Sequence, residues 1–167
     1  DTYNRHRDDG VHELSEAKFE EMNREVSGTL DHHFRAAKHV IELLAVLKKS
    51  GRKTALVTTR GANSLPRLLK QHGLDTAFDV IINRTSCKER KPHPQPLALA
   101  LERLGVTDPK RAAYIGDKQE DDVRAADALG LGQVILVNSG ELDPHDAQPT
   151  HHVRSLLPIL QRFSLPY

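Results

Sequence analysis

Three polar segments of this chain carry side chains that could bind a phosphate group and a divalent cation, and each one comes after a short apolar run. The first segment is Thr58-Thr59-Arg60, which offers hydroxyl and backbone N–H groups just before a predicted helix. The start of a helix favours an anion because of its dipole and its unpaired amides. The same threonines could instead simply cap that helix, so this segment predicts phosphate binding only together with other signals.

The second segment ends in Arg90-Lys91-Pro92-His93-Pro94. Two prolines around one residue stiffen the loop and fix its direction. The ammonium group of Lys91 could therefore be held over a phosphate as a point charge. A solvated lysine that precedes a helix would have the same local sequence.

The third segment contains Asp117 directly after an apolar run, followed by Asp121 and Asp122. A carboxylate at a strand end and another on the first helical turn can bring hard oxygen ligands to one Mg²⁺ ion. Asp121 or Asp122 could also cap a helix, but capping does not account for Asp117. The segment therefore predicts a metal site.

The elements that must position these segments alternate between strand and helix. The sequence predicts four strands, at residues 54–58, 78–82, 112–115 and 134–137. It predicts helices at residues 31–50, 63–72, 94–104 and 121–129, and a last helix with a stripe of Val153, Leu156, Leu157 and Leu160. Such alternation is typical of an α/β protein, with a Rossmann-like parallel sheet that carries helices on both faces. Because the carboxyl ends of parallel strands share one edge, we expect the three segments to meet there.

Together the segments resemble three motifs of the haloacid dehalogenase (HAD) superfamily, in its phosphoglycolate-phosphatase-like branch with a helical cap. TALVTTR is similar to the second motif of that superfamily, RKPHPQP to the third and YIGDKQEDDVRAADALG to the fourth. The order and spacing of the motifs agree as well, and the resemblance runs from about residue 34 to residue 160.

The resemblance implies a role for each matching residue. Thr58 would bond the phosphoryl group, Thr59 would contribute through its backbone, and Lys91 would neutralise charge on the phosphoryl oxygens and on the nucleophile. Asp117 would hold Mg²⁺, and Asp121 or Asp122 would support that site directly or through water. One extra residue in GDKQEDD leaves the choice between these two acids open. The implied function is a magnesium-dependent phosphatase that acts on a small phosphorylated metabolite.

The resemblance also implies an Asp nucleophile in an Asp-x-Asp-Gly motif after the first strand, and this motif does not occur in the sequence. The most similar stretch of sequence, at residues 7–11, has Arg at the position of the nucleophile. We therefore expect residues 1–30 to be the remnant of a helical cap and residues 31–167 to be a HAD-like core without its central first strand. Such a chain should be inactive by itself, and its exposed strand edges should make it aggregate, swap strands or pair the two flanking strands.

Several other functions agree with the same residues. The chain could be a phosphate-binding or regulatory protein that has lost its nucleophile. Inside the superfamily it could be a phosphomutase, or a 2-haloacid dehalogenase, although Asp117 and Asp122 argue against the metal-free dehalogenase. A receiver-like domain would leave the Lys91-Pro92 loop without a role. The substrate and the oligomeric state are not predicted.

Composition limits the partners of the chain. Lys and Arg (24) nearly balance Asp and Glu (23), so no strong overall charge favours nucleic acid or an anionic membrane. No apolar run approaches the roughly 18 residues of a membrane span. The single cysteine, Cys87, excludes an internal disulfide, and we expect a cytoplasmic protein. A basic rim should lie along the carboxyl edge of the sheet and attract phosphorylated substrates, formed by Arg60, Arg84, Lys88, Arg90, Lys91 and Lys118.

Overall fold

The structure, a computed structural model, describes residues 35–164. The chain divides into two units between Phe34 and Arg35. The predicted cap remnant at residues 1–30 and the segment at residues 7–11 therefore lie outside the described residues. Among residues 35–164, no helix has the length and apolar character that a membrane span requires.

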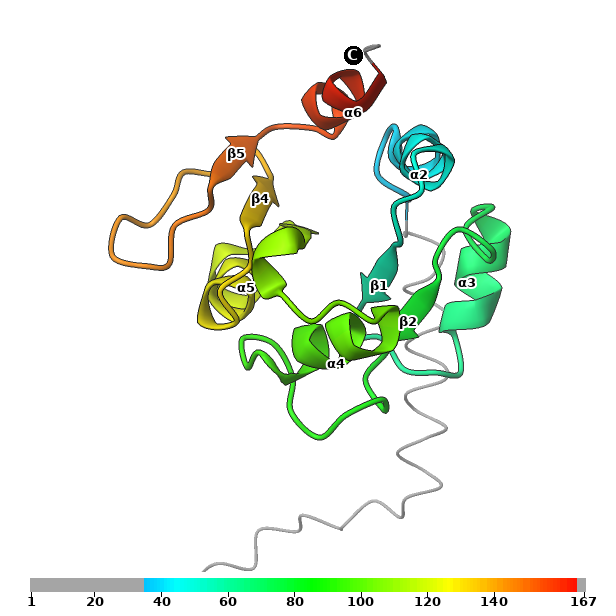
Figure 1. Cartoon of the computed structure of the whole chain (residues 1–167), viewed down its shortest axis with the longest axis horizontal. Helices are drawn as coiled ribbons and strands as arrows, with labels where there is room; N and C mark the ends of the chain where they lie inside the picture. The colour runs from blue at the N-terminus through cyan, green and yellow to red at the C-terminus, as the bar shows by residue number, and fades with distance from the viewer. Residues whose placement is uncertain (1–34, 165–167) are drawn as a thin grey trace, which may run out of the picture. The chain divides into compact units, whose positions relative to one another are not determined.

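The described strands form two parallel sheets (Figure 1). The first sheet pairs β1 (Ala55–Val57) with β2 (Val80–Ile82). The second has the order β3-β4-β5, with strands Ala113–Gly116, Gln133–Val137 and His151–Val153. All four predicted strands are present, and β5 is an additional one. The placement of Val153 in the last helix was wrong, because Val153 pairs in parallel with Val137.

The described helices agree with the predicted ones in order but not in every boundary. They are α2 (Val40–Lys49), α3 (Leu65–Gln71), α4 (Gln95–Leu104), α5 (Arg124–Ala128) and α6 (Leu157–Ser164). A short 3₁₀ turn, η1 (Pro109–Arg111), precedes β3, and a π-helical turn, η2 (Gln119–Val123), leads into α5. Helix α2 starts later than predicted because His39 has a φ of 70°, a left-handed conformation that interrupts a helix.

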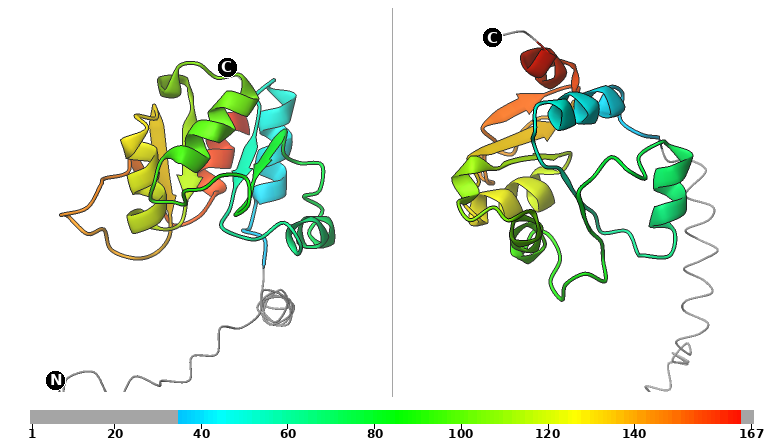
Figure 2. Two further views of the ribbon diagram at one scale, coloured as in Figure 1. Left: turned by 90° about the horizontal axis from the view of Figure 1, so that it is seen from below. Right: turned by 45° about the vertical axis from the view of Figure 1, so that its right-hand side comes forward.

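Side chains on both faces of β4 are buried, which confirms helices on both faces of this sheet. Val134 and Leu136 belong to one apolar cluster with Leu97 of α4. Ile135 points the opposite way and packs with Leu43 of α2. Helices α2 and α6 contact each other, and Figure 2 shows them side by side.

Two helices connect the two sheets. Val40 of α2 packs against the cluster that contains Ile135 of β4 and also against the cluster under α3. Helix α4 contacts both β1 and β2, while its residue Leu97 belongs to the same apolar cluster as Val134 of β4. The described core is therefore held together through helices, because no strand of residues 35–164 pairs with both sheets.

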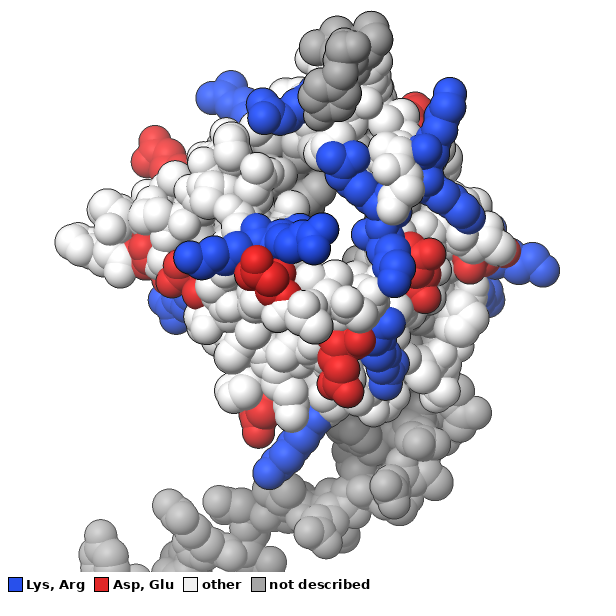
Figure 3. All heavy atoms as spheres, viewed as in Figure 1, with Lys and Arg blue, Asp and Glu red and all other residues white. Residues whose placement is uncertain are grey.

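Strands β1 and β3 each have an unpaired edge among the described residues. Strand β1 pairs with β2, and β3 pairs with β4, but β1 and β3 do not pair with each other. Ile115 of β3 is 37% exposed, an unusual value for an apolar residue of a sheet in this class. The surface is hollowed at the centre of the view in Figure 3, and Lys and Arg side chains gather around the hollow. Among residues 35–164, no strand pairs with these edges of β1 and β3.

Gly132 allows η1 to approach the start of β4. Its N–H group donates to the carbonyl of Pro109 at 3.2 Å, and a Cβ atom at Gly132 would lie 1.8 Å from the carbonyl oxygen of Lys110. We therefore expect Gly132→Ala to lower the free energy of unfolding by about 1–3 kcal/mol, measured by urea denaturation. Gly61→Ala is the matched control, because a Cβ atom there meets nothing within 4 Å. Equal stability of both variants would contradict this account.

Candidate active site

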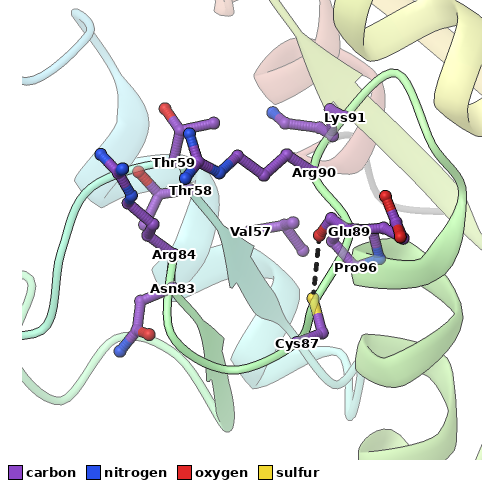
Figure 4. Close-up of a pocket in the computed structure, with 10 residues that line it drawn as sticks. All are labelled: Val57, Thr58, Thr59, Asn83, Arg84, Cys87, Glu89, Arg90, Lys91 and Pro96. Atoms are coloured by element: carbon purple, nitrogen blue, oxygen red, sulfur yellow. Dashed lines mark hydrogen bonds between the residues drawn. The ribbon is translucent and has the colours of Figure 1, made fainter.

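One pocket collects residues from the ends of β1 and β2 and from the loop that leads into α4 (Figure 4). It is lined by Val57, Thr58, Thr59, Asn83, Arg84, Cys87, Glu89, Arg90, Lys91 and Pro96. The structure therefore brings together Thr58, Thr59 and Lys91, as the sequence predicted. Asp117, Asp121 and Asp122 do not line this pocket.

Backbone hydrogen bonds hold the loops after β1 and β2 side by side. The N–H group of Thr58 donates to the carbonyl of Ile82 at 2.9 Å, and that of Arg84 donates to the carbonyl of Arg60 at 2.9 Å. The hydroxyl oxygen of Thr58 accepts the N–H group of Arg60 at 3.2 Å. The alternative that Thr58 and Thr59 cap the next helix is wrong, because α3 begins at Leu65.

Lys91 is held from two sides. Its ammonium group donates to Oδ1 of Asp122 at 2.5 Å and to the hydroxyl oxygen of Tyr114 at 2.9 Å. The Lys91 side chain is 12% exposed and that of Asp122 is 4% exposed. The alternative of a solvated lysine is therefore wrong. A lysine fixed in this way can present its charge to a ligand at a defined place.

Asp122 is the centre of this hydrogen-bond network. Its Oδ1 atom accepts from Lys91 and from the Tyr114 hydroxyl at 2.9 Å, and its Oδ2 atom accepts the backbone N–H groups of Asp117 and Lys118, both at 3.0 Å. Burial acts to raise the pKa of Asp122, but the hydrogen bond and the charge of Lys91 outweigh it and lower this pKa below its ordinary value. Asp122 is therefore a buried carboxylate that ties Lys91 to the end of β3.

The π-helical turn η2 explains which of the two acids faces inward. The N–H group of Val123 donates to the carbonyl of Lys118, five residues earlier, at 3.3 Å. A π turn accommodates one more residue than an α turn, so η2 absorbs the extra residue of GDKQEDD. Asp122 is buried, whereas the Asp121 side chain is 37% exposed, with Oδ2 3.8 Å from the ammonium of Lys118. A signal for this choice was present, since Asp122 precedes the buried pair Ala125 and Ala126 by three and four residues.

Asp117 is the acid whose carboxylate is available to a cation. It is exposed, and its carboxylate makes no hydrogen bond or ion pair with the residues from 35 to 164, while its carbonyl accepts from Nδ2 of Asn138 at 2.9 Å. In the described part of the chain, no three His, Cys, Asp or Glu residues are grouped so that they could hold a metal ion. Mg²⁺ often takes only one or two protein carboxylates and completes its shell with water and phosphate oxygens. Asp117 fits one such ligand, but both oxygens of Asp122 already accept hydrogen bonds.

Tyr114 is a residue of the site that sequence reasoning missed. Its hydroxyl accepts from Lys91 and donates to Asp122, so it bridges the ion pair. Burial, and then the negative charge of Asp122, raise the pKa of Tyr114 far above its ordinary value, which keeps the phenol protonated. The sequence indicated its position in part, because alternate residues of a strand point to the same face. Tyr114 and Gly116, which directly precedes Asp117, therefore lie on one face of β3.

Comparison with protein families identifies the class to which this fold and this site belong. A family model described as haloacid dehalogenase-like hydrolase matches residues 2–137. The chain therefore belongs to the haloacid dehalogenase-like hydrolase family.

Individual relatives agree with this family. The chain is 35% identical over 123 residues to a phosphoglycolate phosphatase of Nitrosococcus oceani, an alignment that covers 72% of this chain and 53% of that protein. It is 37% identical over 101 residues to pyrophosphatase PpaX of Bacillus cereus, with 59% and 46% covered. The chain thus spans about half the length of the curated relatives that it matches.

A solved structure confirms the predicted fold. The crystal structure of a HAD phosphatase from Thermococcus onnurineus matches with a TM-score of 0.70 and 27% identity. The match covers 85% of this chain and 64% of that one. The predicted HAD-like α/β fold is therefore correct.

Proposed function

We propose that this chain supplies the phosphate-binding and magnesium-binding groups of a phosphatase that hydrolyses a small phosphorylated metabolite. The observation that carries the proposal is the position of Lys91. Asp122 and Tyr114 fix its ammonium group, and Lys91 lines the same pocket as Thr58 and Thr59. We further propose a cytoplasmic protein that acts on a small molecule rather than on nucleic acid or a membrane.

The proposed role of these residues is electrostatic. Phosphoryl transfer needs mainly positioning and stabilisation of negative charge on the phosphoryl oxygens. Lys91 would neutralise this charge and the Thr58 hydroxyl would donate a hydrogen bond to it, both from positions fixed before the substrate binds. Asp117 would hold Mg²⁺, which when bound would neutralise further charge on the phosphoryl group. Asp122 would keep Lys91 in place, and Asp121 would contribute at most through water.

The nucleophile is the part of the reaction that these residues do not supply. The sequence contains no Asp-x-Asp-Gly motif, and we propose that the 167-residue chain binds phosphate without turning it over. The same observation favours a second function, a phosphate-binding or regulatory protein without catalysis. The coding sequence upstream of Asp1 separates the two functions. An apolar strand that ends in Asp-x-Asp-Gly would support the enzyme, and a start codon directly before Asp1 would support the binder.

Binding of methyl phosphate to the chain tests the proposed roles. Lys91→Ala should weaken it roughly 10- to 100-fold in isothermal titration calorimetry, because a charge-assisted hydrogen bond contributes about 1.5–3 kcal/mol. Lys91→Gln, which can still donate to Asp122, should lose affinity to a similar extent. In the wild-type chain MgCl₂ should raise the affinity, and in Asp117→Asn this effect should be absent.

Lys110→Ala is the control for both effects, since Lys110 lies in η1 at the amino end of β3. It should leave the affinity for methyl phosphate unchanged. Circular dichroism would show that each variant is folded. The proposal fails if Lys91→Gln binds methyl phosphate as well as the wild-type chain does and Asp117→Asn keeps the magnesium effect.

A further inference from the structure

Two arginines of the pocket, Arg84 and Arg90, have no role in the function proposed above. Both line the pocket together with Thr58, Thr59 and Lys91. Figure 4 shows the Arg90 side chain extending across the pocket toward Thr59, and the Arg84 side chain rising beside Thr58. The backbone of Arg84 is anchored, because its N–H group donates to the carbonyl of Arg60 at 2.9 Å. Neither guanidinium group forms a hydrogen bond or an ion pair with the described residues.

The positive charge of the pocket comes mainly from these two arginines. Lys91 is already paired with the buried carboxylate of Asp122. Glu89 lines the pocket as well, but in Figure 4 its carboxylate points away from both guanidinium groups. Two like charges that share one pocket repel each other, and an anion bound between them would relieve the repulsion. The pocket therefore has unbalanced positive charge beside the site that we assign to the phosphoryl group.

A single phosphoryl group would not use all of these donors. Lys91 and the Thr58 hydroxyl are already directed at it in the proposed function. Each guanidinium adds five N–H donors in a planar fork that matches a carboxylate or a phosphate. A second anionic group on the substrate would accept hydrogen bonds from the N–H groups of these two guanidinium groups.

We propose that Arg84 and Arg90 form a second anion subsite next to the phosphoryl site. The substrate would then be a small molecule that carries a phosphoryl group and, a few bonds away, a second anionic group. A carboxylate and a second phosphate share the required chemistry. This inference rests on the proposed function, because it takes the phosphoryl group to lie between Thr58 and Lys91.

Three probes test the subsite in calorimetric titrations without metal, in the presence of EDTA. Methyl phosphate has one anionic group, phosphonoacetate adds a carboxylate and pyrophosphate adds a second phosphate. The wild-type chain should bind at least one of the last two about 10- to 100-fold more tightly than methyl phosphate, the range of a charge-assisted hydrogen bond. In the double variant Arg84→Gln/Arg90→Gln this preference should fall to within about twofold. The affinity for methyl phosphate should fall by a smaller factor than the affinity for the two-anion probe, because methyl phosphate would lose only the attraction of nearby charges.

Lys88→Gln is the matched control, because it removes one positive charge from the same loop at an exposed residue that does not line the pocket. It should keep the preference of the wild-type chain. Tighter binding of phosphonoacetate alone, or of pyrophosphate alone, would support the subsite and identify its anion.

Three outcomes would overturn the subsite. The first is that the wild-type chain shows no preference for a two-anion probe, or binds neither of them. The second is that Lys88→Gln loses as much of the preference as the double variant does. The third is that the double variant loses as much affinity for methyl phosphate as for the two-anion probe. The last would mean that the arginines bind the phosphoryl group itself. Failure of the proposed function has a different signature, since Lys91→Gln would then leave methyl phosphate binding unchanged.

Discussion

Asp122→Ala should lower the free energy of unfolding by about 3–5 kcal/mol, the usual cost of removing one partner of a buried ion pair. The carboxylate of Asp122 accepts from Lys91 and Tyr114 and from two backbone N–H groups, and the residue is 3% exposed. Its removal leaves the ammonium of Lys91 without its counter-charge in a site where water has little access. Urea denaturation of the variant and the wild-type chain measures the effect.

Two controls separate this loss from a general effect of charge. Asp121→Ala should change stability by no more than about 1 kcal/mol, because Asp121 is half-exposed and its ion pair with Lys118 lies at the surface. The double variant Lys91→Met/Asp122→Leu should recover most of the stability, since it removes both charges together. A double variant as unstable as Asp122→Ala would show that the lost backbone contacts, rather than the unpaired charge, cause the effect.

The carboxylate of Asp122 makes the free energy of unfolding depend on pH, and the direction of its pKa shift fixes the sign of this dependence. The pKa of Asp122 is lower in the folded chain than its ordinary value, which in an unfolded chain is about 4. Below that pH the unfolded state binds more protons than the folded one, so stability falls as the pH decreases toward the folded pKa of Asp122. Asp146, whose pKa the hydrogen bond from Arg124 lowers, adds a contribution of the same sign. The double variant Lys91→Met/Asp122→Leu lacks the contribution of Asp122 but keeps that of Asp146. As the pH decreases below about 4, its free energy of unfolding should therefore fall less than that of the wild-type chain, but it should still fall.

Local patterns predicted most of the elements that position the site. Apolar runs such as residues 80–82 and 134–137 were recognisable because strands buried on both faces are continuously apolar. Strand β5 was not, since its sequence His-His-Val carries little strand signal and its pairing with β4 is a contact between distant residues. Val153 also lies three residues before Leu156, a spacing that fits a helix as well as a strand.

The site was predictable as a meeting of strand ends but not as a network of contacts. Parallel topology was enough to bring Thr58 and Lys91 into one pocket. The bond between Lys91 and Asp122 joins residues 31 positions apart. It also depends on the π turn η2, which the sequence indicates only through the extra residue of GDKQEDD. Tyr114 was missed for a related reason, because its role arises from burial between these two charges.

The free edges of β1 and β3 should make the chain associate with itself. An unpaired edge presents a row of N–H and C=O groups to which a strand of another molecule can bond. Among the described residues nothing pairs with these two edges, and Ile115 leaves apolar surface exposed beside one of them. We expect sedimentation velocity to show dimers or larger species that increase with protein concentration. A single monomeric species at every concentration would contradict this prediction.

Ile115→Lys should shift this equilibrium toward the monomer by about tenfold or more, because a charged side chain on an edge strand opposes pairing with another strand. Ile41→Lys is the matched control, since Ile41 of α2 is 51% exposed and lies on no strand. If both variants reduce association equally, exposed apolar surface in general, and not the strand edge, drives it. If Ile115→Lys alone does so, the edge of β3 that is unpaired among the described residues is where a strand binds.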